Sequence, residues 1–158
     1  MNTAMAENHP KSRTLLGFDY GLKRIGVAVG QELTATANAL TTIRAVDGKP
    51  DWEAITRLIQ QWQPDAVVVG LPLNMDGSYH DLTYRAKRFG NQLQGRYNLR
   101  AHFIDERLSS LEAEGLLKTK SRKLQAAEID KMAARVILES WLAQESVDHE
   151  NESTEGGD

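Results

Sequence analysis

The stretch 15–30, LLGFDYGLKRIGVAVG, narrows the possible folds of this chain more than any other. Residues 14–19 form a mostly apolar run, Gly21 suits a tight turn, and 24–30 alternates large β-branched residues with small ones. This period of two predicts two strands joined by a short turn, which must therefore run antiparallel. The Thr-rich segment 34–43 is also β-prone and predicts a third strand of the same meander.

After this meander the pattern changes to the period of a helix. Asp51 is placed to cap a helix whose apolar stripe runs from Trp52 to Trp62, and Pro64 ends it. The β-branched run 65–70 is typical of a strand buried on both faces of a parallel sheet. The remaining pattern predicts a helix at 79–97, a strand at 99–106, a helix in SSLEAEGLLKT and a last helix at 125–144. This order, βββαβαβαα, is that of the ribonuclease H-like fold. It predicts an α/β mixed sheet, with three antiparallel strands and then two parallel strands, and helices on both faces.

Length and composition set the domain organisation. With 158 residues, the chain suits one domain at 14–144, between a disordered polar leader at 1–13 and a disordered acidic tail at 145–158. The absence of cysteine excludes disulfides and thiolate metal sites. No apolar run is long enough for a bilayer or a signal peptide, so we expect a cytoplasmic protein without membrane contact. Without the tail, 19 basic residues outnumber 16 acidic ones, which suits a polyanionic partner.

Acidic residues stand at the ends of two predicted strands. Asp19 ends the first strand in an otherwise apolar run, where a carboxylate is costly unless something compensates it. Asp105 and Glu106 end the last strand, and their side chains point to opposite sides of the sheet. One of the two can face the same site as Asp19, and the spacing leaves open which. The alternative is that Asp19 is a turn residue and that Glu106 is a surface acid paired with Arg107.

Asp130 is the third acidic residue of interest. On a helical wheel it shares a face with Ala134 and Ile137, and this face is predicted to pack on the sheet. Small alanines nearby would let the helix approach closely. The alternative is a surface acid paired with Lys131 or Arg135.

Three carboxylates brought together would repel one another, and a divalent ion such as Mg²⁺ or Mn²⁺ would relieve that repulsion. Two such ions, about 3.5–4 Å apart, suit an in-line displacement at phosphorus, where one activates water and the other stabilises the leaving oxygen. The acidic residues therefore predict a metal site for phosphodiester hydrolysis.

Polar and basic residues near these strand ends are candidates for binding substrate. The loop in VVVGLPLNMDGS follows the buried strand at its carboxyl end, where open α/β sheets place ligands. Asn74, Asp76 and Ser78 could contact phosphate or sugar there, although Asp-Gly is also a common turn pair. The cations that could bind a phosphate backbone are Lys23, Arg24, Arg85, Lys87, Arg88, Arg107 and the segment KTKSRK. A solvated helix face is the alternative for the helical ones.

Four of these segments together resemble the successive motifs of a known family. FDYGLKRIGVAVG, VVVGLPLNMDGS, FIDERLSSLEAE and IDKMAARVILESWL look like those of the YqgF family, the Holliday-junction-resolvase-like pre-16S rRNA nucleases of bacteria. The resemblance covers about 14–143. It implies a ribonuclease H-like fold, a cytoplasmic location and a metal-dependent nuclease that trims the 5′ end of precursor 16S ribosomal RNA.

The resemblance also implies roles for individual residues. Asp19 of DYG, Glu106 of DER and Asp130 of IDKMAA would be the catalytic metal ligands, which prefers Glu106 over Asp105. Ser110 stands where the family pattern has Thr and keeps the hydroxyl. We further expect Lys23, Arg24, Asn74 and Arg107 to bind substrate.

Three other functions compete with RNA maturation. A Holliday-junction resolvase, acting on branched DNA, would need two active sites and hence a homodimer, whereas an RNA nuclease can act as a monomer. An actin-like nucleotide-binding module would need a second half, for which the chain is too short. A non-catalytic RNA-binding assembly factor would not need its carboxylates.

Overall fold

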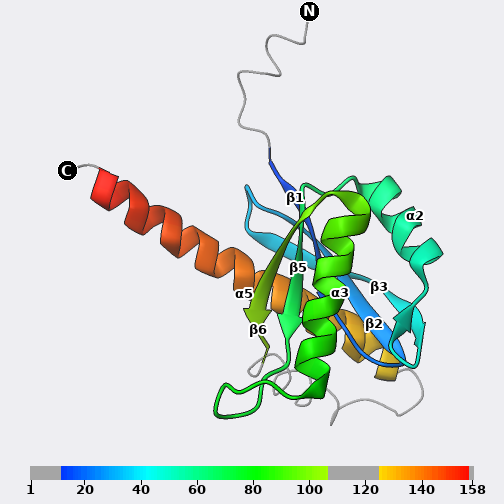
Figure 1. The fold of residues 1–158 in the computed structure, drawn as a ribbon. Coiled ribbons are helices and arrows are strands. Elements are labelled where there is room, and N and C mark those ends of the chain that lie inside the picture. The colour runs from blue at the N-terminus through cyan, green and yellow to red at the C-terminus, as the bar shows by residue number, and fades with distance from the viewer. Residues whose placement is uncertain (1–11, 107–124, 157–158) are drawn as a thin grey trace, which may run out of the picture.

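The protein is described by a computed structural model in which residues 12–106 and 125–156 are placed, with side chains at 12–106 and 126–145. One sheet has the strand order β4-β3-β2-β1-β5-β6 (Figure 1). Its strands are β1 (Thr14–Asp19), β2 (Arg24–Gln31), β3 (Thr36–Val46), β4 (Lys49–Pro50), β5 (Ala66–Leu71) and β6 (Arg100–Asp105). The helices in the described residues are α2 (Trp52–Trp62), α3 (Asp81–Tyr97) and α5 (Gln125–Gly156).

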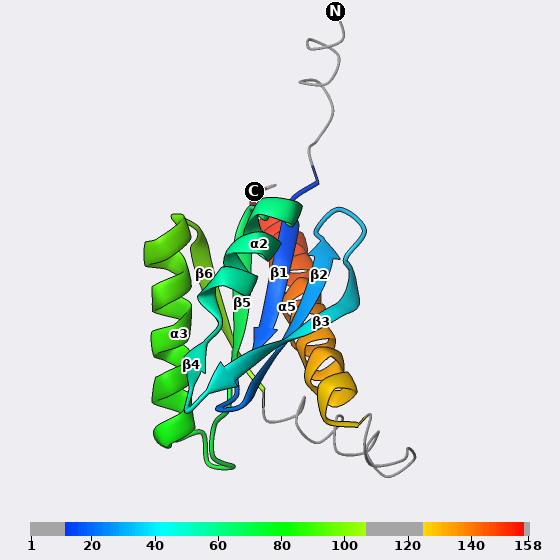
Figure 2. The ribbon, with the colours of Figure 1, turned by 90° about the vertical axis from the view of Figure 1, so that its right-hand side faces the viewer.

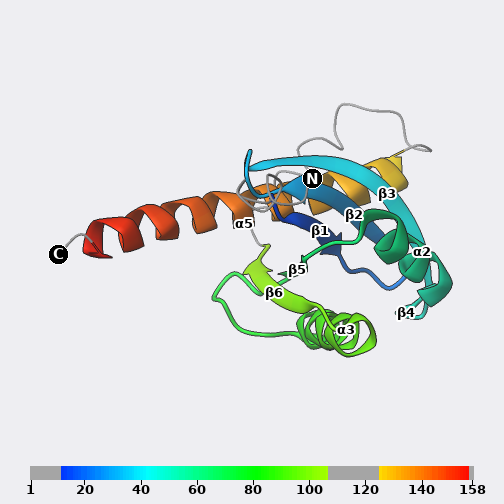
Figure 3. The same ribbon diagram turned by 90° about the horizontal axis from the view of Figure 1, so that it is seen from above.

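The strand directions confirm the predicted mixed sheet of the ribonuclease H-like fold. β1, β2 and β3 form an antiparallel meander, whereas β5 runs parallel to β1 and β6 runs parallel to β5. Figure 3 shows α5 along one face of the sheet. Helices α3 and α2 lie on the other face. The short strand β4, antiparallel to the end of β3, is not predicted, because two residues are too few to show an alternation.

The predicted limits of α2 are confirmed at both ends. The Asp51 carboxylate accepts a hydrogen bond of 3.2 Å from the backbone N–H of Ala54, which is the expected N-cap. Gln63 then leaves the helix in the left-handed conformation, and Pro64 follows it. Pro64 cannot continue a helix, so the chain passes directly into β5.

The last helix is longer than predicted. α5 continues past the predicted end at 144 to Gly156, within the part of the sequence for which disorder is predicted, and Figure 1 shows it extending past the sheet. No glycine or proline interrupts the sequence between 125 and 155, so nothing in it breaks the helix. The helix predicted in SSLEAEGLLKT lies outside the described residues. None of the described helices is long and apolar enough to cross a membrane.

Strand alternation divides the core into two layers and decides which side of the sheet each end residue faces. Leu16, Phe18 and Tyr20 belong to the layer covered by α2 and α3, whereas Leu15 belongs to the layer under α5. The period of two therefore directs Asp19 to the α5 side.

α5 lies very close to the sheet at Gly26 of β2. A Cβ atom at this position would lie 1.8 Å from the carbonyl oxygen of Asp130, so the helix backbone lies directly on the glycine. The sequence predicts a close approach through the alanines of the helix, whereas here a glycine of the strand allows it. This contact places Asp130 beside the end of β1.

We expect Gly26→Ala to lower the free energy of unfolding by about 3 kcal/mol, because backbone on both sides of the contact must shift to admit the methyl group. Gly95→Ala is the matched control, since nothing lies within 4 Å of its Cβ position in α3. This control should raise the free energy of unfolding by about 0.5–1 kcal/mol through helix propensity. Urea unfolding of both variants measures the two effects, and equal stabilities would contradict the close contact.

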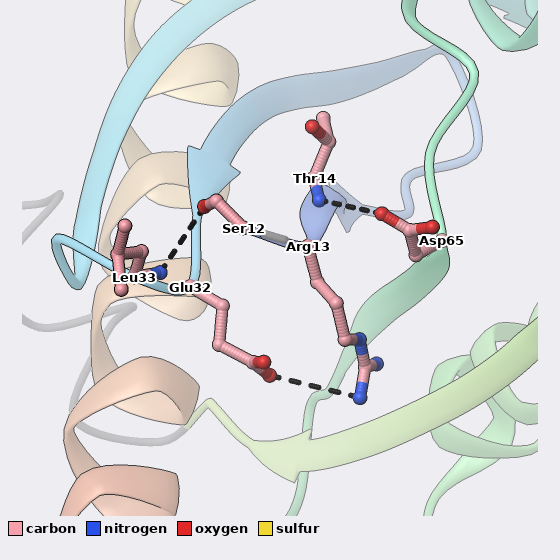
Figure 4. Close-up of polar contacts among 6 residues, drawn as sticks. All are labelled: Ser12, Arg13, Thr14, Glu32, Leu33 and Asp65. Carbon is pink, nitrogen blue, oxygen red and sulfur yellow. Dashed lines mark hydrogen bonds and ion pairs between the residues drawn. The ribbon is translucent and has the colours of Figure 1, made fainter. Parts of the chain in front are cut away.

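At the other end of the strands, polar contacts surround the beginning of β1 (Figure 4). The backbone N–H of Thr14 donates to the Asp65 carboxylate at 2.8 Å. Arg13 lies 3.7 Å from the Glu32 carboxylate and forms an ion pair. Asp65 therefore supports the start of the same strand that Asp19 ends.

Candidate metal centre

The three predicted ligands come from elements that meet at one edge of the sheet. β1, β5 and β6 are parallel, so their carboxyl ends lie together, and Figure 2 shows these ends at the lower edge with the beginning of α5. Asp19 is the last residue of β1, Glu106 follows β6, and Asp130 lies near the beginning of α5. Topology thus brings together residues that are far apart in the sequence.

Asp19 and Glu106 are in direct contact. Their carboxyl groups lie within hydrogen-bonding distance of each other. Glu106 is buried, with 6 % of its surface exposed, whereas Asp105 is exposed. The backbone N–H of Glu106 donates to the carbonyl of Leu71 at 3.1 Å, which fixes Glu106 against the end of β5. The alternation of side chains therefore directs Glu106, and not Asp105, toward Asp19.

A glycine at the end of β5 makes room for the Glu106 carboxylate. A Cβ atom at Gly70 would lie 2.3 Å from Oε2 of Glu106, so no other residue fits there without a shift of the carboxylate. Oε2 is buried and has no hydrogen-bond partner among the described residues. A buried oxygen without a partner is unfavourable, and a cation bound at this place would satisfy it.

The two carboxyl groups hold their protons more tightly than usual. Burial raises the pKa of Asp19 from its ordinary 3.8 to about 6, the hydrogen bond with Glu106 opposes this rise, and the nearby charge of Asp130 adds to it. Burial also raises the pKa of Glu106 well above its ordinary value, and the charge of Asp19 adds to this effect. A protonated Glu106 that donates to an ionised Asp19 is the arrangement that these shifts favour. Divalent cations of the Mg²⁺ type bind such oxygen ligands.

Asp130 is held beside this pair by a cation of the protein. Nε of Arg24 lies 2.7 Å from Oδ2 of Asp130, and the two side chains are 44 % and 21 % exposed. Lys131 and Arg135, the expected partners of a surface acid, instead pair with glutamates of their own helix. No three acidic, histidine or cysteine side chains in the described residues are close enough together to form a complete metal site. The structure therefore joins two of the three predicted ligands and keeps the third close by.

Lys23 and Arg24 line an open groove of about 600 Å³ between the beginning of β2, the end of β3 and the beginning of α5. Arg44 of β3, opposite Arg24 in the strand register, also lines it. Arg44 is not among the cations predicted from the sequence to bind phosphate, although the antiparallel pairing of β2 with β3 could have suggested it. We call this groove, defined by Lys23, Arg24 and Arg44, the first groove.

The other two predicted substrate contacts have different outcomes. The amide of Asn74 donates to the Ser78 hydroxyl at 2.9 Å and so helps to close its own loop. Its binding role stays a prediction. Arg107 lies outside the described residues.

This combination of features defines a class of protein. A ribonuclease H-like sheet with buried carboxylates at the ends of its parallel strands is the arrangement of a nuclease that hydrolyses phosphodiester bonds. Its oxygen donors fit a divalent cation, because carboxylates are the ligands that such ions take and Oε2 of Glu106 is buried without a partner among the described residues. The chain belongs to the RuvX family, described as Holliday junction resolvase, whose sequence model matches residues 13–144.

Two relatives match this chain over nearly their whole length. A protein of Nitrosococcus oceani named "Putative pre-16S rRNA nuclease" is 53 % identical over 144 residues, which cover 90 % of this chain and 95 % of the relative. A protein of Yersinia enterocolitica with the same name is 50 % identical over 137 residues, covering 85 % of this chain and 98 % of the relative. Among solved structures, RuvC of T. thermophilus in complex with a Holliday junction substrate aligns with a TM-score of 0.49 and 16 % identity, covering 85 % of this chain and 96 % of RuvC.

Proposed function

We propose that this protein is a cytoplasmic, divalent-metal-dependent nuclease that acts in maturation of the 5′ end of precursor 16S ribosomal RNA. The observation that carries this proposal is the buried contact between the Asp19 and Glu106 carboxyl groups at the ends of β1 and β6. The substrate is supported by the names of relatives that are about 50 % identical to this chain. These relatives align with 85–90 % of its length.

Asp19, Glu106 and Asp130 would hold Mg²⁺ or Mn²⁺. When bound, such ions activate water and stabilise the leaving oxygen of an in-line displacement. Asp19 and Glu106 must lose the proton that they share before both can act as ligands. Asp130 must leave its ion pair with Arg24, whose guanidinium then becomes available for a phosphate group of the substrate.

The first groove would bind the phosphate backbone next to the cleaved bond. Once Arg24 has left Asp130, Lys23, Arg24 and Arg44 supply three positive charges there, and Asp47 is the carboxylate among the lining residues. Arginine favours this role because its planar guanidinium donates two parallel hydrogen bonds to a phosphate. We retain Asn74 and Arg107 as further substrate contacts, since Asn74 follows the end of β5 and Arg107 directly follows Glu106.

Cleavage of branched DNA is the second candidate, because the family is described as Holliday junction resolvase. A resolvase makes two cuts and so requires a homodimer, whereas RNA trimming requires only a monomer. A non-catalytic role in ribosome assembly would leave the buried carboxyl pair without a purpose.

Purified full-length protein can be incubated with a precursor 16S fragment that carries its 5′ extension, in Mg²⁺ or Mn²⁺. A four-way DNA junction and the mature 16S fragment serve as comparison substrates. We expect cleavage within the 5′ extension, no cleavage of the mature fragment, and loss of activity on addition of EDTA. Junction cleavage by a dimer, with an intact RNA precursor, would favour the second candidate. Activity that resists EDTA would overturn the metal-dependent mechanism.

A further inference from the structure

A second groove lies on the face of the sheet opposite α5. None of the three predicted metal ligands lines it. It has a volume of about 390 Å³ and lies between the turn after β3, the short strand β4 and helix α3. We define this second groove by its cations, Lys49, Arg85 and Arg88. Figure 2 shows β4 beside α3, so residues distant in sequence form its two walls.

The cations of the second groove are largely uncompensated. Asp47 is the one carboxylate among the residues that line it. In the part of the chain that the structure describes, Lys49 and Arg88 have no carboxylate within ion-pairing distance. Arg85 binds Asp81 at 3.0 Å through Nε, but its Nη1 points elsewhere and lies 3.1 Å from the Cβ position of Gly48. The guanidinium therefore keeps an edge directed into the groove.

A tyrosine hydroxyl lies at the second groove together with both arginines. Tyr20 donates a hydrogen bond of 2.5 Å to the carbonyl of Gly48 and lines the second groove with Trp52. Nη1 of Arg85 and the Tyr20 hydroxyl both lie near the Cβ position of Gly48, at 3.1 and 2.7 Å, and Arg88 lines the same groove. Burial raises the pKa of Tyr20, and the charges of Arg85 and Arg88 oppose that rise. Two guanidinium groups lining one groove, with a lysine beside them, form a site for an anion.

Two features connect the second groove with the candidate metal centre: neighbouring residues at the end of β1, and the turn after β3 that lines both grooves. Tyr20 directly follows Asp19, and alternation directs their side chains to opposite faces of the same strand end. Asp47, in the turn after β3, lines both the first and the second groove. The two grooves therefore meet at this turn, and a chain of phosphates that passes around it can contact both.

We propose that the second groove binds the phosphodiester backbone of the nucleic-acid substrate, a few nucleotides from the bond that is cleaved. This inference rests on the proposed nuclease function and extends it to residues that the family motifs do not include. The separation of the cations into two grooves favours a strand over a free phosphate ion, because only successive phosphates can neutralise both sets at once.

The test measures binding of a fluorescently labelled single-stranded RNA at several salt concentrations. All proteins carry Asp19→Asn, so that cleavage does not interfere. The test variant adds Arg85→Gln with Arg88→Gln, and the matched control adds Arg57→Gln with Arg135→Gln. All four arginines are exposed, and the two variants remove the same charge. Circular dichroism checks that both variants fold.

We expect the test variant to bind about tenfold more weakly. We also expect its slope of log affinity against log salt to fall by about 1.4, since each lost single-strand phosphate contact removes about 0.7. The control should keep the affinity and slope of the parent protein. Equal behaviour of the two variants would overturn the proposal, as would displacement of the RNA by inorganic phosphate at micromolar concentration. The two proposals can fail separately. If the wild-type protein cleaves no precursor RNA but the test variant still shows the smaller salt slope, only the nuclease proposal is refuted.

Discussion

Asp19→Asn is expected to slow cleavage of the precursor 16S fragment by at least about a hundredfold. Metal ions contribute several kcal/mol to stabilisation of the transition state, and each 1.36 kcal/mol lost is a tenfold loss of rate. Asparagine has nearly the same shape as aspartate but lacks the charge needed to hold a divalent cation. The effect should appear in kcat under saturating substrate, because the first groove, which binds the phosphate backbone, is unchanged.

Asp65→Asn is the matched control for this experiment. Asp65 supports the beginning of β1 by accepting a hydrogen bond from Thr14, and the amide oxygen of asparagine can accept the same bond. The two variants thus make the same chemical change, one at the end of β1 and one beside its beginning, where Figure 4 shows Asp65 next to Thr14. Cleavage by Asp19→Asn at the rate of the control would contradict a catalytic role for the carboxyl pair.

In the absence of metal, the protein is expected to become less stable as the pH rises from about 4 to 7. The pKa of Asp19 is raised from 3.8 to about 6 in the folded state, so folding favours the protonated form. The stabilisation by that proton is complete below pH 3.8 and is lost as the pH rises through about 6. The loss amounts to at most about 3 kcal/mol of unfolding free energy. Glu106, whose pKa is also raised, adds a loss of the same sign at higher pH.

Urea unfolding in EDTA at a series of pH values measures this loss. Asp19→Asn removes the charge that is costly to bury, so its stability relative to wild type should rise across the same pH range. Asp65→Asn should not show this relative rise. Mg²⁺ or Mn²⁺ should restore stability to the wild type at pH 7 and have little effect on Asp19→Asn. If the difference in unfolding free energy between wild type and Asp19→Asn is the same at all pH values, the pKa of Asp19 is not raised in the folded state.

Much of the fold could be predicted because its determinants are local. The alternation in 24–30, the cap at Asp51 and the β-branched run 65–70 each act within a few residues, and their order is enough for the mixed sheet. β4 and the length of α5 were missed for local reasons as well. Two residues are too short for a pattern, and a polar acidic composition resembles disorder even where no residue breaks a helix.

The candidate site was predicted in its residue types and only partly in its geometry. By itself, the sequence determined that Asp19 ends a buried strand, that an acid follows β6, and that Asp130 lies on a helix that packs on the sheet. Only the tertiary structure decided that Glu106 faces Asp19, that Arg24 and not a helical neighbour pairs with Asp130, and that Arg85 and Arg88 line one groove with Tyr20. Each of these depends on strand register and on helix position, which bring together atoms from distant segments. Local periodicity predicts which face of a strand or helix a side chain occupies. The packing of α5 on Gly26, and of Glu106 on Gly70, then determines which side chains meet.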